Sequence, residues 1–325
     1  MGLRRYKLIL VTGSSGFVAG SFIDKFSNSE SILGVDLRKR ENLSKEIICD
    51  LTLENSLEVL PKDGEISAIL HSAAIISPKE CELRPYLAMR TNLLGTLNML
   101  EFARKNDVAR FVYISSGGVY QNSKPSDDVT EEWPLNLNGI YSISKISSED
   151  LVRYYSKQYS IDCISLRITA PYGPHMVPKQ DIHIPDALNR HTLIFALKCI
   201  NNENIFMPVG GDHTINYTYI EDITQGIYKS IHSKIKGYEY FNITSGFNYT
   251  IRELGEAIKS LCPQIDVKIG PGNLLNSYDT KDPLNSKLHI QQGKFNISKA
   301  KKLLGYEPQY NLKRGMQDLI KYLKA

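Results

Sequence analysis

Short apolar runs alternate with helical stretches through the first half of the chain, and this alternation constrains the fold more than any other feature. The runs are continuous rather than interrupted by polar residues, which is typical of parallel strands covered on both faces. They occupy residues 7–13, 31–36, 47–50, 68–74, 110–116 and 162–168. Amphipathic segments such as 90–106 separate them. Strand–helix repetition of this kind predicts an α/β fold with a doubly wound parallel sheet.

The regular pattern of apolar runs ends after about residue 172. The stretch "PYGPHMVPKQDIHIPD" carries four prolines in sixteen residues, which suits a loop between two lobes. Later apolar pieces, "NIFMPVG" and "YFNITS", are less regular, and helices are expected near 251–261 and 311–323. We therefore predict one domain over residues 1–172 and a smaller α+β lobe over 173–325, with some elements of the lobe returning to the first domain.

Composition argues against several classes of protein. The net charge of +4 over 325 residues is small, and no basic stripe with interleaved aromatics indicates nucleic-acid binding. No segment approaches the roughly 18 apolar residues of a membrane helix, and the N-terminal apolar run is too short for an export signal. Five cysteines, an odd number without regular spacing, predict reduced thiols and a cytoplasmic location. The sequence has no CxxC motif and no Cys/His cluster that would indicate a metal site.

A glycine loop, "VTGSSGFVAG", follows the first apolar run directly. Gly13 allows a tight turn, Gly16 lets the backbone approach a pyrophosphate at a helix N-terminus, and Ala19 permits close packing of helix on strand. The alternative is a tight turn that binds no ligand. The position of the loop, between a strand and a helix, favours dinucleotide binding.

An acidic residue ends the second predicted strand. Asp36 lies 23 residues after Gly13, where the dinucleotide fingerprint places an acid that bonds the ribose hydroxyls. A carboxylate there repels a 2′-phosphate, so NAD is favoured over NADP. Arg38, Lys39 and Arg40 argue mildly for NADP, but we expect these basic side chains to face water.

A tyrosine and a lysine stand four positions apart in "GIYSISKISSED", residues 139–150. Tyr141 and Lys145 therefore share one face of a helix, as such pairs do on any amphipathic helix. The pair by itself says little about function. It gains meaning only beside a cofactor site.

Taken together, these motifs resemble those of the extended short-chain dehydrogenases/reductases, and within them the NAD-dependent nucleotide-sugar epimerase/dehydratase family. "TGSSGFVAG" is similar to the family's TGxxGFxG, "TNLLGT" to its (T/N)NxxGT, "SSGGVY" to SSxxVYG, "YSISK" to YxxxK and "LRITAPYGP" to LRxxNVYGP. "CDLT", "HSAA" and "NISKAKKLLGYEP" also match segments of these proteins. The resemblance covers nearly the whole chain and implies a Rossmann domain that binds NAD.

The resemblance also implies roles for individual residues. Tyr141 corresponds to the acid/base, Lys145 to the group that tunes it and bonds the nicotinamide ribose, and Ser116 to the residue that hydrogen-bonds the reacting hydroxyl. An ammonium about 5 Å from the phenol is expected to lower the tyrosine pKa by roughly two units. The implied cofactor contacts are Gly13, Ser15, Gly16, Phe17, Val18, Asp36, Asp50, Leu51, Ala73, Ala74, Thr91, Tyr141 and Lys145.

Several positions depart from the family pattern. Gly117 and Gly118 stand where the family's dehydratases carry an Asp–Glu pair, which makes dehydration by that route unfavourable. Ala170 replaces an asparagine that reaches the substrate, and Ile215 replaces an arginine that binds its diphosphate. Residues that could compensate for these lost anchors are His213, Arg190, Lys179 and Lys294.

Two enzymatic activities remain open from the sequence. One is a nucleotide-sugar epimerase that oxidises a hydroxyl transiently and keeps its NAD. The other is an NAD-dependent dehydrogenase or reductase for a small alcohol, sugar acid or hydroxy acid, which the changes at Ala170 and Ile215 favour. A sensor without turnover fits less well, since Ser116, Tyr141 and Lys145 are intact. Family members often dimerise through two helices, here 90–106 and 141–159, so a homodimer is expected.

Overall fold

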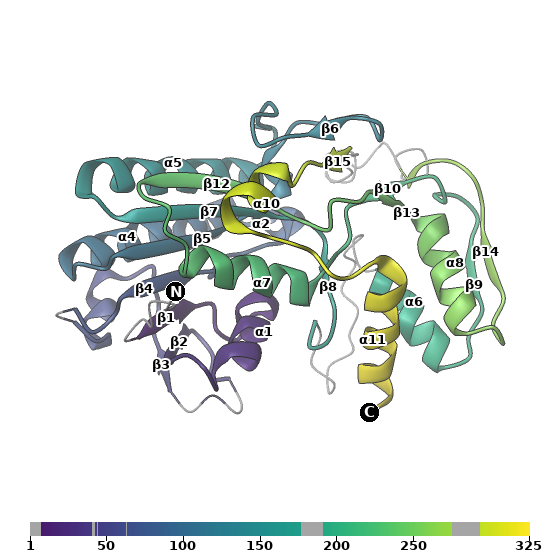
Figure 1. Ribbon diagram of the computed structural model, residues 1–325, viewed down its shortest axis with the longest axis horizontal. Coiled ribbons are helices and arrows are strands. Elements are labelled where there is room, and N and C mark those ends of the chain that lie inside the picture. The colour runs from purple at the N-terminus through teal and green to yellow at the C-terminus, as the bar shows by residue number, and fades with distance from the viewer. Residues whose placement is uncertain (1–7, 41–42, 44, 63, 177–190, 275–292) are drawn as a thin grey trace.

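A seven-stranded parallel sheet forms the centre of the protein, in the order β12-β7-β5-β4-β1-β2-β3. The computed structural model describes residues 8–40, 43, 45–62, 64–176, 191–274 and 293–325 (Figure 1). The strands of the sheet are β1 (Ile9–Thr12), β2 (Ile32–Asp36), β3 (Glu46–Ile48), β4 (Ala68–His71), β5 (Arg110–Ser116), β7 (Asp162–Ile168) and β12 (Tyr238–Ile243). All neighbours in the sheet run parallel. The predicted doubly wound α/β sheet is confirmed.

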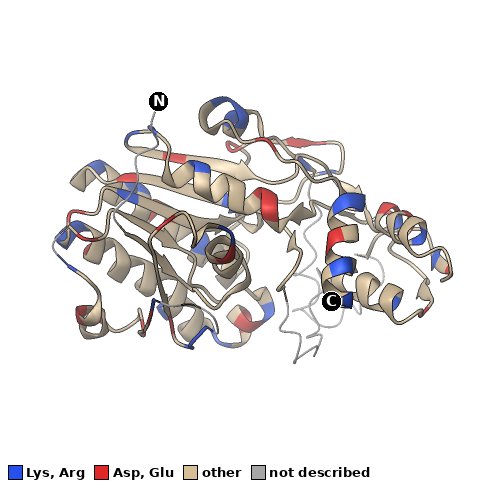
Figure 2. Ribbon diagram, turned by 60° about the horizontal axis from the view of Figure 1, so that its bottom comes forward, with Lys and Arg blue, Asp and Glu red and all other residues tan. Residues whose placement is uncertain are grey.

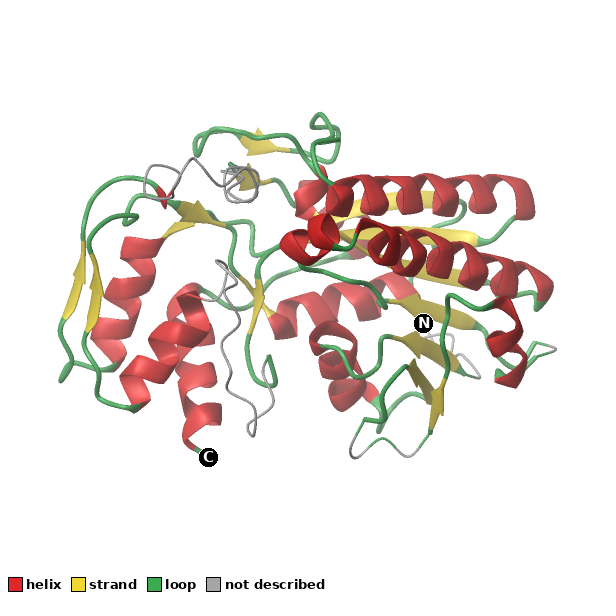
Figure 3. Ribbon diagram, turned by 180° about the vertical axis from the view of Figure 1, so that it is seen from behind, coloured by secondary structure: helices red, strands yellow, loops and turns green. Residues whose placement is uncertain are grey.

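Helices cover both faces of this sheet, which explains why its strands are apolar without interruption. The helices α1 (Phe17–Phe26) and α7 (Ile220–Ile231) pack on one face, and α4 (Gly95–Lys105) and α5 (Ile140–Tyr159) pack on the other (Figure 3). Successive residues of β1 divide between the two layers. Ile9 and Val11 belong to the core beneath α1 and α7, while Leu10 belongs to the core beneath α4 and α5.

A smaller group of elements lies beside the sheet, at the right of Figure 1. It contains α6 (His191–Ile200), α8 (Ile251–Leu261), α11 (Leu312–Lys324) and the strands β9 (Ile205–Met207), β10 (Thr214–Ile215), β13 (Tyr249–Thr250) and β14 (Val267–Ile269). The helix α8 begins with a capping box in which Thr250 and Glu253 satisfy each other's backbone N–H groups. The helices expected near 251–261 and 311–323 are thus confirmed as α8 and α11.

The chain does not divide simply at one residue. The first four residues of "YFNITS" belong to β12, which pairs with β7 at the edge of the main sheet. The remaining elements are η1 (Glu54–Val59), α2 (Pro78–Leu83), α3 (Pro85–Met89), the π-helix η2 (Arg90–Leu94), η3 (Gly117–Val119), β6 (Asp128–Val129), β8 (Pro171–Tyr172), β11 (Thr218–Tyr219), β15 (Lys294–Phe295) and α10 (Ser298–Leu304). A domain boundary at residue 172 stays a prediction.

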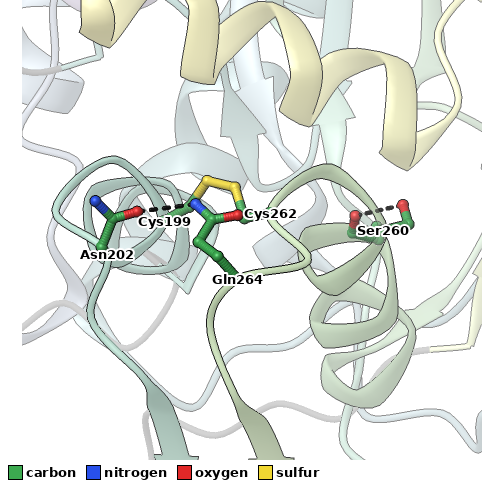
Figure 4. The surroundings of a disulfide bond; sticks show 6 residues. Cys199, Asn202, Ser260, Cys262 and Gln264 are labelled. Carbon is green, nitrogen blue, oxygen red and sulfur yellow. Dashed lines mark hydrogen bonds between the residues drawn. A yellow bond between two sulfur atoms is a disulfide. The ribbon is translucent and has the colours of Figure 1, made fainter.

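A disulfide joins two helices of the smaller group (Figure 4). Cys199, near the end of α6, pairs with Cys262, which follows α8, and their Cα atoms are 5.9 Å apart. The expectation that all thiols are reduced is therefore wrong for this pair, because the fold brings together two cysteines that are 63 residues apart. Cysteine usage no longer supports a reducing compartment, and a cytoplasmic location stays a prediction.

Charged residues of both signs are interspersed along the elements of the sheet domain and the smaller group (Figure 2). Among the helices of the described chain, none is both long and apolar enough to cross a membrane.

Candidate active site

The glycine loop joins the carboxyl end of β1 to the start of α1. Gly13 has a φ of +70°, and a Cβ at this position would lie 2.8 Å from the backbone nitrogen of Ala73. Only glycine satisfies both the left-handed backbone and the close approach. Gly16 is the N-cap of α1 and offers no capping side chain, which leaves the helix start suited to a diphosphate.

The other residues predicted in this loop lie around that helix start. Ser15 is exposed, and Phe17 and Val18 are half-buried on the first turn of α1. The tight glycine turn and the uncapped start of α1 are therefore the features that suit a dinucleotide.

Asp36 closes β2 beside the glycine loop, as its spacing predicts. Its carboxylate accepts hydrogen bonds from the backbone nitrogens of Ser15, at 3.0 Å, and Arg38, at 3.1 Å. The carboxylate thus stands at the tip of the strand, next to the loop, where an adenosine ribose lies in the dinucleotide fold.

The basic residues after Asp36 do not all face water. Arg38 and Lys39 are exposed, but Arg40 is half-buried. Its guanidinium donates to the carbonyl of Ser14 at 3.1 Å and to Asp24 at 2.6 Å. The expectation of solvation is therefore wrong for Arg40, because its long side chain reaches back over α1. This engagement also removes Arg40 as a ready partner for a 2′-phosphate.

A second set of predicted contacts follows β3 and β4. Leu51 is buried, and Asp50 accepts bonds from the nitrogen and hydroxyl of Thr52 at 2.9 and 2.7 Å. Arg90, from η2, lies 3.6 Å from the Asp50 carboxylate. Sequence reasoning did not include Arg90, since only the fold brings η2 beside this turn. The remaining predicted contacts, Ala73, Ala74 and Thr91, are half-buried.

Asn92 ties three parts of the site together and was also missed. Its side chain accepts from the nitrogen of Ile75 at 2.7 Å and donates to the carbonyl of Ile75 and the hydroxyl of Ser144, both at 3.0 Å. It belongs to the π-helix η2, and π-helical turns are frequent at functional sites. The signal lay in "TNLLGT", where only the threonine received a role.

Ser116 and Tyr141 border the same space at the carboxyl end of β5. A Cβ added at Gly118 would lie 3.3 Å from the Ser116 hydroxyl and 3.5 Å from Cε1 of the Tyr141 ring. Burial raises the pKa of Tyr141 to about 12, although its hydrogen bond with Ser116 acts to lower it. The structure therefore brings together the serine and the tyrosine that the motifs single out.

Lys145 lies one turn further along α5 and is fully buried. Its ammonium donates to the carbonyl of Ile114 at 2.8 Å and lies 4.9 Å from the centre of the Tyr113 ring. Burial lowers its pKa to about 8, against the opposing charge of Glu149. The expected lowering of the Tyr141 pKa by this ammonium does not appear here, because burial outweighs other influences on the phenol.

His71, the first residue of the motif "HSAA", does not resemble a catalytic base. Its two ring nitrogens lie 2.8 Å from the Thr12 hydroxyl and 3.0 Å from the Thr96 hydroxyl. Burial, aided by the charge of Lys145, lowers its pKa to about 3. His71 is therefore neutral and holds β1, β4 and α4 together. Within the described ranges, no group of three or more His, Cys, Asp or Glu side chains could hold a metal ion.

The glycines after Ser116 have different surroundings. A Cβ at Gly117 would lie 2.4 Å from Cγ2 of Thr169 and 2.8 Å from the Phe295 ring, so a longer side chain has no room there. A Cβ at Gly118 would instead meet the Tyr141 ring at ordinary contact distance and the Ser116 hydroxyl slightly more tightly. The acidic pair of the dehydratases is therefore absent, and its first position is closed by packing.

The two positions where the resemblance implies substrate anchors lie in apolar or strained surroundings. Ile215 is 8% exposed and belongs to the main core. Ala170 has a φ of +32°, in a region that favours glycine and asparagine.

The residues that could replace these anchors differ in their surroundings. His213 is buried beside Asn273, with 2.6 Å between Nδ1 and Oδ1, and burial lowers its pKa, so it is a poor partner for a phosphate at neutral pH. Lys294 is exposed on β15, whereas Lys179 and Arg190 lie outside the described residues.

Comparison with known proteins shows the family to which the chain belongs. The NAD dependent epimerase/dehydratase family matches residues 9–244, more than half of the chain. The protein belongs to this family, which is NAD-dependent and consists of enzymes of the extended short-chain dehydrogenase/reductase type.

Individual relatives cover almost the full length. UDP-glucuronic acid decarboxylase 6 of Arabidopsis thaliana is 29% identical over 321 residues, which are 95% of this chain and 86% of the relative. UDP-glucose 4-epimerase of Mycolicibacterium smegmatis is 23% identical over 327 residues, 97% of this chain and 98% of the relative. The crystal structure of Thermus thermophilus UDP-glucose 4-epimerase in complex with NAD matches with a TM-score of 0.80 and 22% identity, covering 98% and 99% of the two chains.

Proposed function

We propose that the protein is an NAD-dependent nucleotide-sugar epimerase that uses Ser116, Tyr141 and Lys145. The glycine loop, Asp36 and Lys145 would hold NAD, which would supply a reversible hydride acceptor for the sugar carbon. Tyr141 takes the proton of the reacting hydroxyl and later gives it back, and Ser116 orients that hydroxyl. Lys145 bonds the nicotinamide ribose and supplies positive charge near the phenol.

One observation carries this proposal: Ser116 and Tyr141 border the same space at the carboxyl edge of the sheet that also holds the glycine loop. In open α/β sheets this edge is where ligands bind. The relatives named for UDP-sugar epimerisation and decarboxylation support a nucleotide sugar as the substrate.

The cofactor proposal is specific for NAD over NADP. Asp36 stands beside the glycine loop, and Arg40 is engaged with Asp24 and the Ser14 carbonyl. Calorimetry on protein stripped of nucleotide should show NAD binding at least about tenfold more tightly than NADP, because a carboxylate repels the 2′-phosphate. Tighter binding of NADP would show that Asp36 does not select the cofactor.

The activity is tested on the purified protein with its bound nucleotide. The protein is incubated with a panel of UDP-, dTDP- and GDP-sugars and, separately, with small alcohols and hydroxy acids. Epimerisation predicts new sugar signals in proton NMR without lasting absorbance at 340 nm. Lasting absorbance at 340 nm with a small alcohol, and no turnover of any nucleotide sugar, would contradict the proposal.

That second outcome defines the alternative, a dehydrogenase for a small alcohol, sugar acid or hydroxy acid. The specific observation in its favour is the burial of Ile215 in the core, where the family carries an arginine for the substrate diphosphate. Competition distinguishes the two candidates, since a nucleoside diphosphate should inhibit the epimerase and not the small-substrate enzyme.

We also infer a homodimer formed through α4 and α5. Exposed apolar side chains on or next to these helices, Leu94 and Tyr154, support this arrangement. Analytical ultracentrifugation should give twice the chain mass of 36.7 kDa. A monomer at micromolar concentration would exclude it.

A further inference from the structure

The helix that carries Tyr141 and Lys145 begins without a capping side chain of its own. The N-cap of α5 is Gly139, and the first turn contains no acidic residue. The first N–H groups of a helix have no partner within the helix and need an acceptor from elsewhere. For a helix whose second residue is the proposed acid/base, the way its start is held decides where the phenol stands.

Glu82, from the separate short helix α2, supplies this acceptor. Its Oε1 accepts a hydrogen bond from the backbone nitrogen of Ile140 at 2.7 Å, across 58 residues of chain. The same oxygen would lie 3.1 Å from a Cβ at Gly139, so the missing side chain leaves the carboxylate its room. A carboxylate at a helix N-terminus makes a charge-assisted bond and also complements the helix dipole.

The helix that presents Glu82 is itself fixed in place. Ser77 caps α2 by accepting from the nitrogen of Glu80 at 3.2 Å. Cys81 is fully buried, and its thiol donates to the carbonyl of Ile75 at 3.6 Å. Ile75 is in turn held by Asn92. The Glu82 bond therefore connects an anchored part of the sheet domain to the start of α5.

We propose that Glu82 is a positioning residue for Tyr141, acting through the first turn of α5. Ile140, the group that Glu82 holds, directly precedes Tyr141. A displacement of this turn changes the distance between the phenol and Ser116, which α5 and β5 bring from different parts of the chain. The catalytic consequence rests on the proposed function, but the hold on α5 does not.

Three substitutions separate the contribution of the Glu82 acceptor oxygen from that of its charge. Glu82→Ala removes the acceptor, and Glu82→Gln keeps an amide oxygen in the same place without the charge. Glu80→Ala is the matched control, because Glu80 is an exposed acid on the same helix that pairs only loosely with Arg84, at 3.8 Å.

Hydrogen exchange tests the hold on the helix. In Glu82→Ala, amides of residues 139–142 should exchange at least about tenfold faster than in the wild type, since a bonded N–H loses its partner. Glu80→Ala should exchange at about the wild-type rate, and Glu82→Gln should fall between the wild type and Glu82→Ala, because it keeps the acceptor without the charge. Unchanged exchange in Glu82→Ala would overturn the proposal.

A second measurement follows Tyr141 without relying on turnover. With tyrosine labelled at Cζ by ¹³C and the signal assigned through Tyr141→Phe, the Tyr141 resonance should move in Glu82→Ala and stay in place in Glu82→Gln and Glu80→Ala. On an active substrate, kcat of Glu82→Ala should fall about tenfold while NAD affinity stays within about twofold, as for a lost alignment rather than a lost binding contact.

The outcomes separate the two proposals. Faster exchange with an unmoved Tyr141 signal would leave Glu82 a stabilising cap only and overturn its positioning role. A wild-type protein that turns over neither nucleotide sugars nor small alcohols would overturn the proposed function, while exchange and the Tyr141 signal would still decide the role of Glu82.

Discussion

At the scale of single residues, burial sets the ionisation of the two central groups of the site. Burial raises the pKa of Tyr141 to about 12 and lowers that of Lys145 to about 8. Both shifts disfavour the charged form, as expected where a group leaves water. A phenol in this state holds its proton firmly at neutral pH.

Tyr141→Phe is expected to lower kcat by at least about a hundredfold, because it removes the proposed acid/base and leaves the ring in place. NAD affinity should hardly change. Steady-state kinetics and calorimetry measure the two quantities, and Tyr159→Phe, an exposed tyrosine on the same helix, serves as the control. Near-full activity of Tyr141→Phe would require another base.

Ala170 stores backbone strain where the family carries asparagine. Its φ of +32° costs an L-residue with a Cβ about 1–2 kcal/mol, and asparagine tolerates this region better. Ala170→Asn should therefore raise the free energy of unfolding by about 0.5–1 kcal/mol. Urea denaturation measures the change. Ala109→Asn, at an exposed alanine outside the positive-φ residues, should stay within about 0.5 kcal/mol of the wild type.

At the scale of elements, the segment 90–106 shows where sequence patterns stop being informative. Its amphipathic pattern predicts one helix, and the structure has a π-helix, η2, followed by α4. The π-helical turn places Asn92 against Ile75, in the loop after β4, and Ser144, in α5. Periodicity describes only one face of one helix, so a turn stabilised by contacts to other elements leaves no trace in it.

Asn92→Ala should lower the free energy of unfolding by about 3 kcal/mol, because it removes the three hydrogen bonds that this buried side chain makes with Ile75 and Ser144. Asn98→Ala is the comparison on the same helical run. Its side chain donates to the carbonyl of Leu51 at 2.8 Å, and the loss of that bond should cost about 1 kcal/mol. Equal losses in urea denaturation would show that Asn92 has no special role.

The elements that the sequence predicts well are those with strong local signals. The apolar runs predict β1, β2, β4, β5 and β7 closely, and the glycine spacing predicts the loop before α1. The positions of Arg40, Arg90 and Glu82 could not be predicted, since each acts on a residue far away in the chain. The disulfide could not be predicted for the same reason. Cysteine spacing does not indicate which pairs the fold brings together.

At the scale of the whole molecule, buried tyrosines dominate the change in the free energy of unfolding at high pH. Burial raises the pKa above the ordinary value of 10 for the tyrosines Tyr113, Tyr120, Tyr172, Tyr217 and Tyr306. A group whose pKa is higher in the folded state contributes stability that is complete below its unfolded pKa and is lost as pH rises above it. Lys145 acts in the opposite sense between about pH 8 and 10.5, since its pKa is lowered on folding.

The free energy of unfolding should therefore fall steeply above about pH 10, as the tyrosine contribution is lost. Absorbance at 295 nm should show the buried tyrosines ionising together with loss of structure. Urea denaturation between pH 8 and 11 measures the stability directly. A gradual titration of all tyrosines near pH 10 in the folded protein would contradict this.

The return of β12 to the main sheet has a consequence for how the chain is made. During synthesis β7 leaves the ribosome well before β12, which forms only after the connecting segments have been translated. In the interval, β7 is an open strand edge of the nascent protein, and an open apolar edge invites pairing with other chains. The protein therefore passes through an aggregation-prone stage that ends only when residues 238–243 have been added, and slow translation of that stretch should lower its yield in cells.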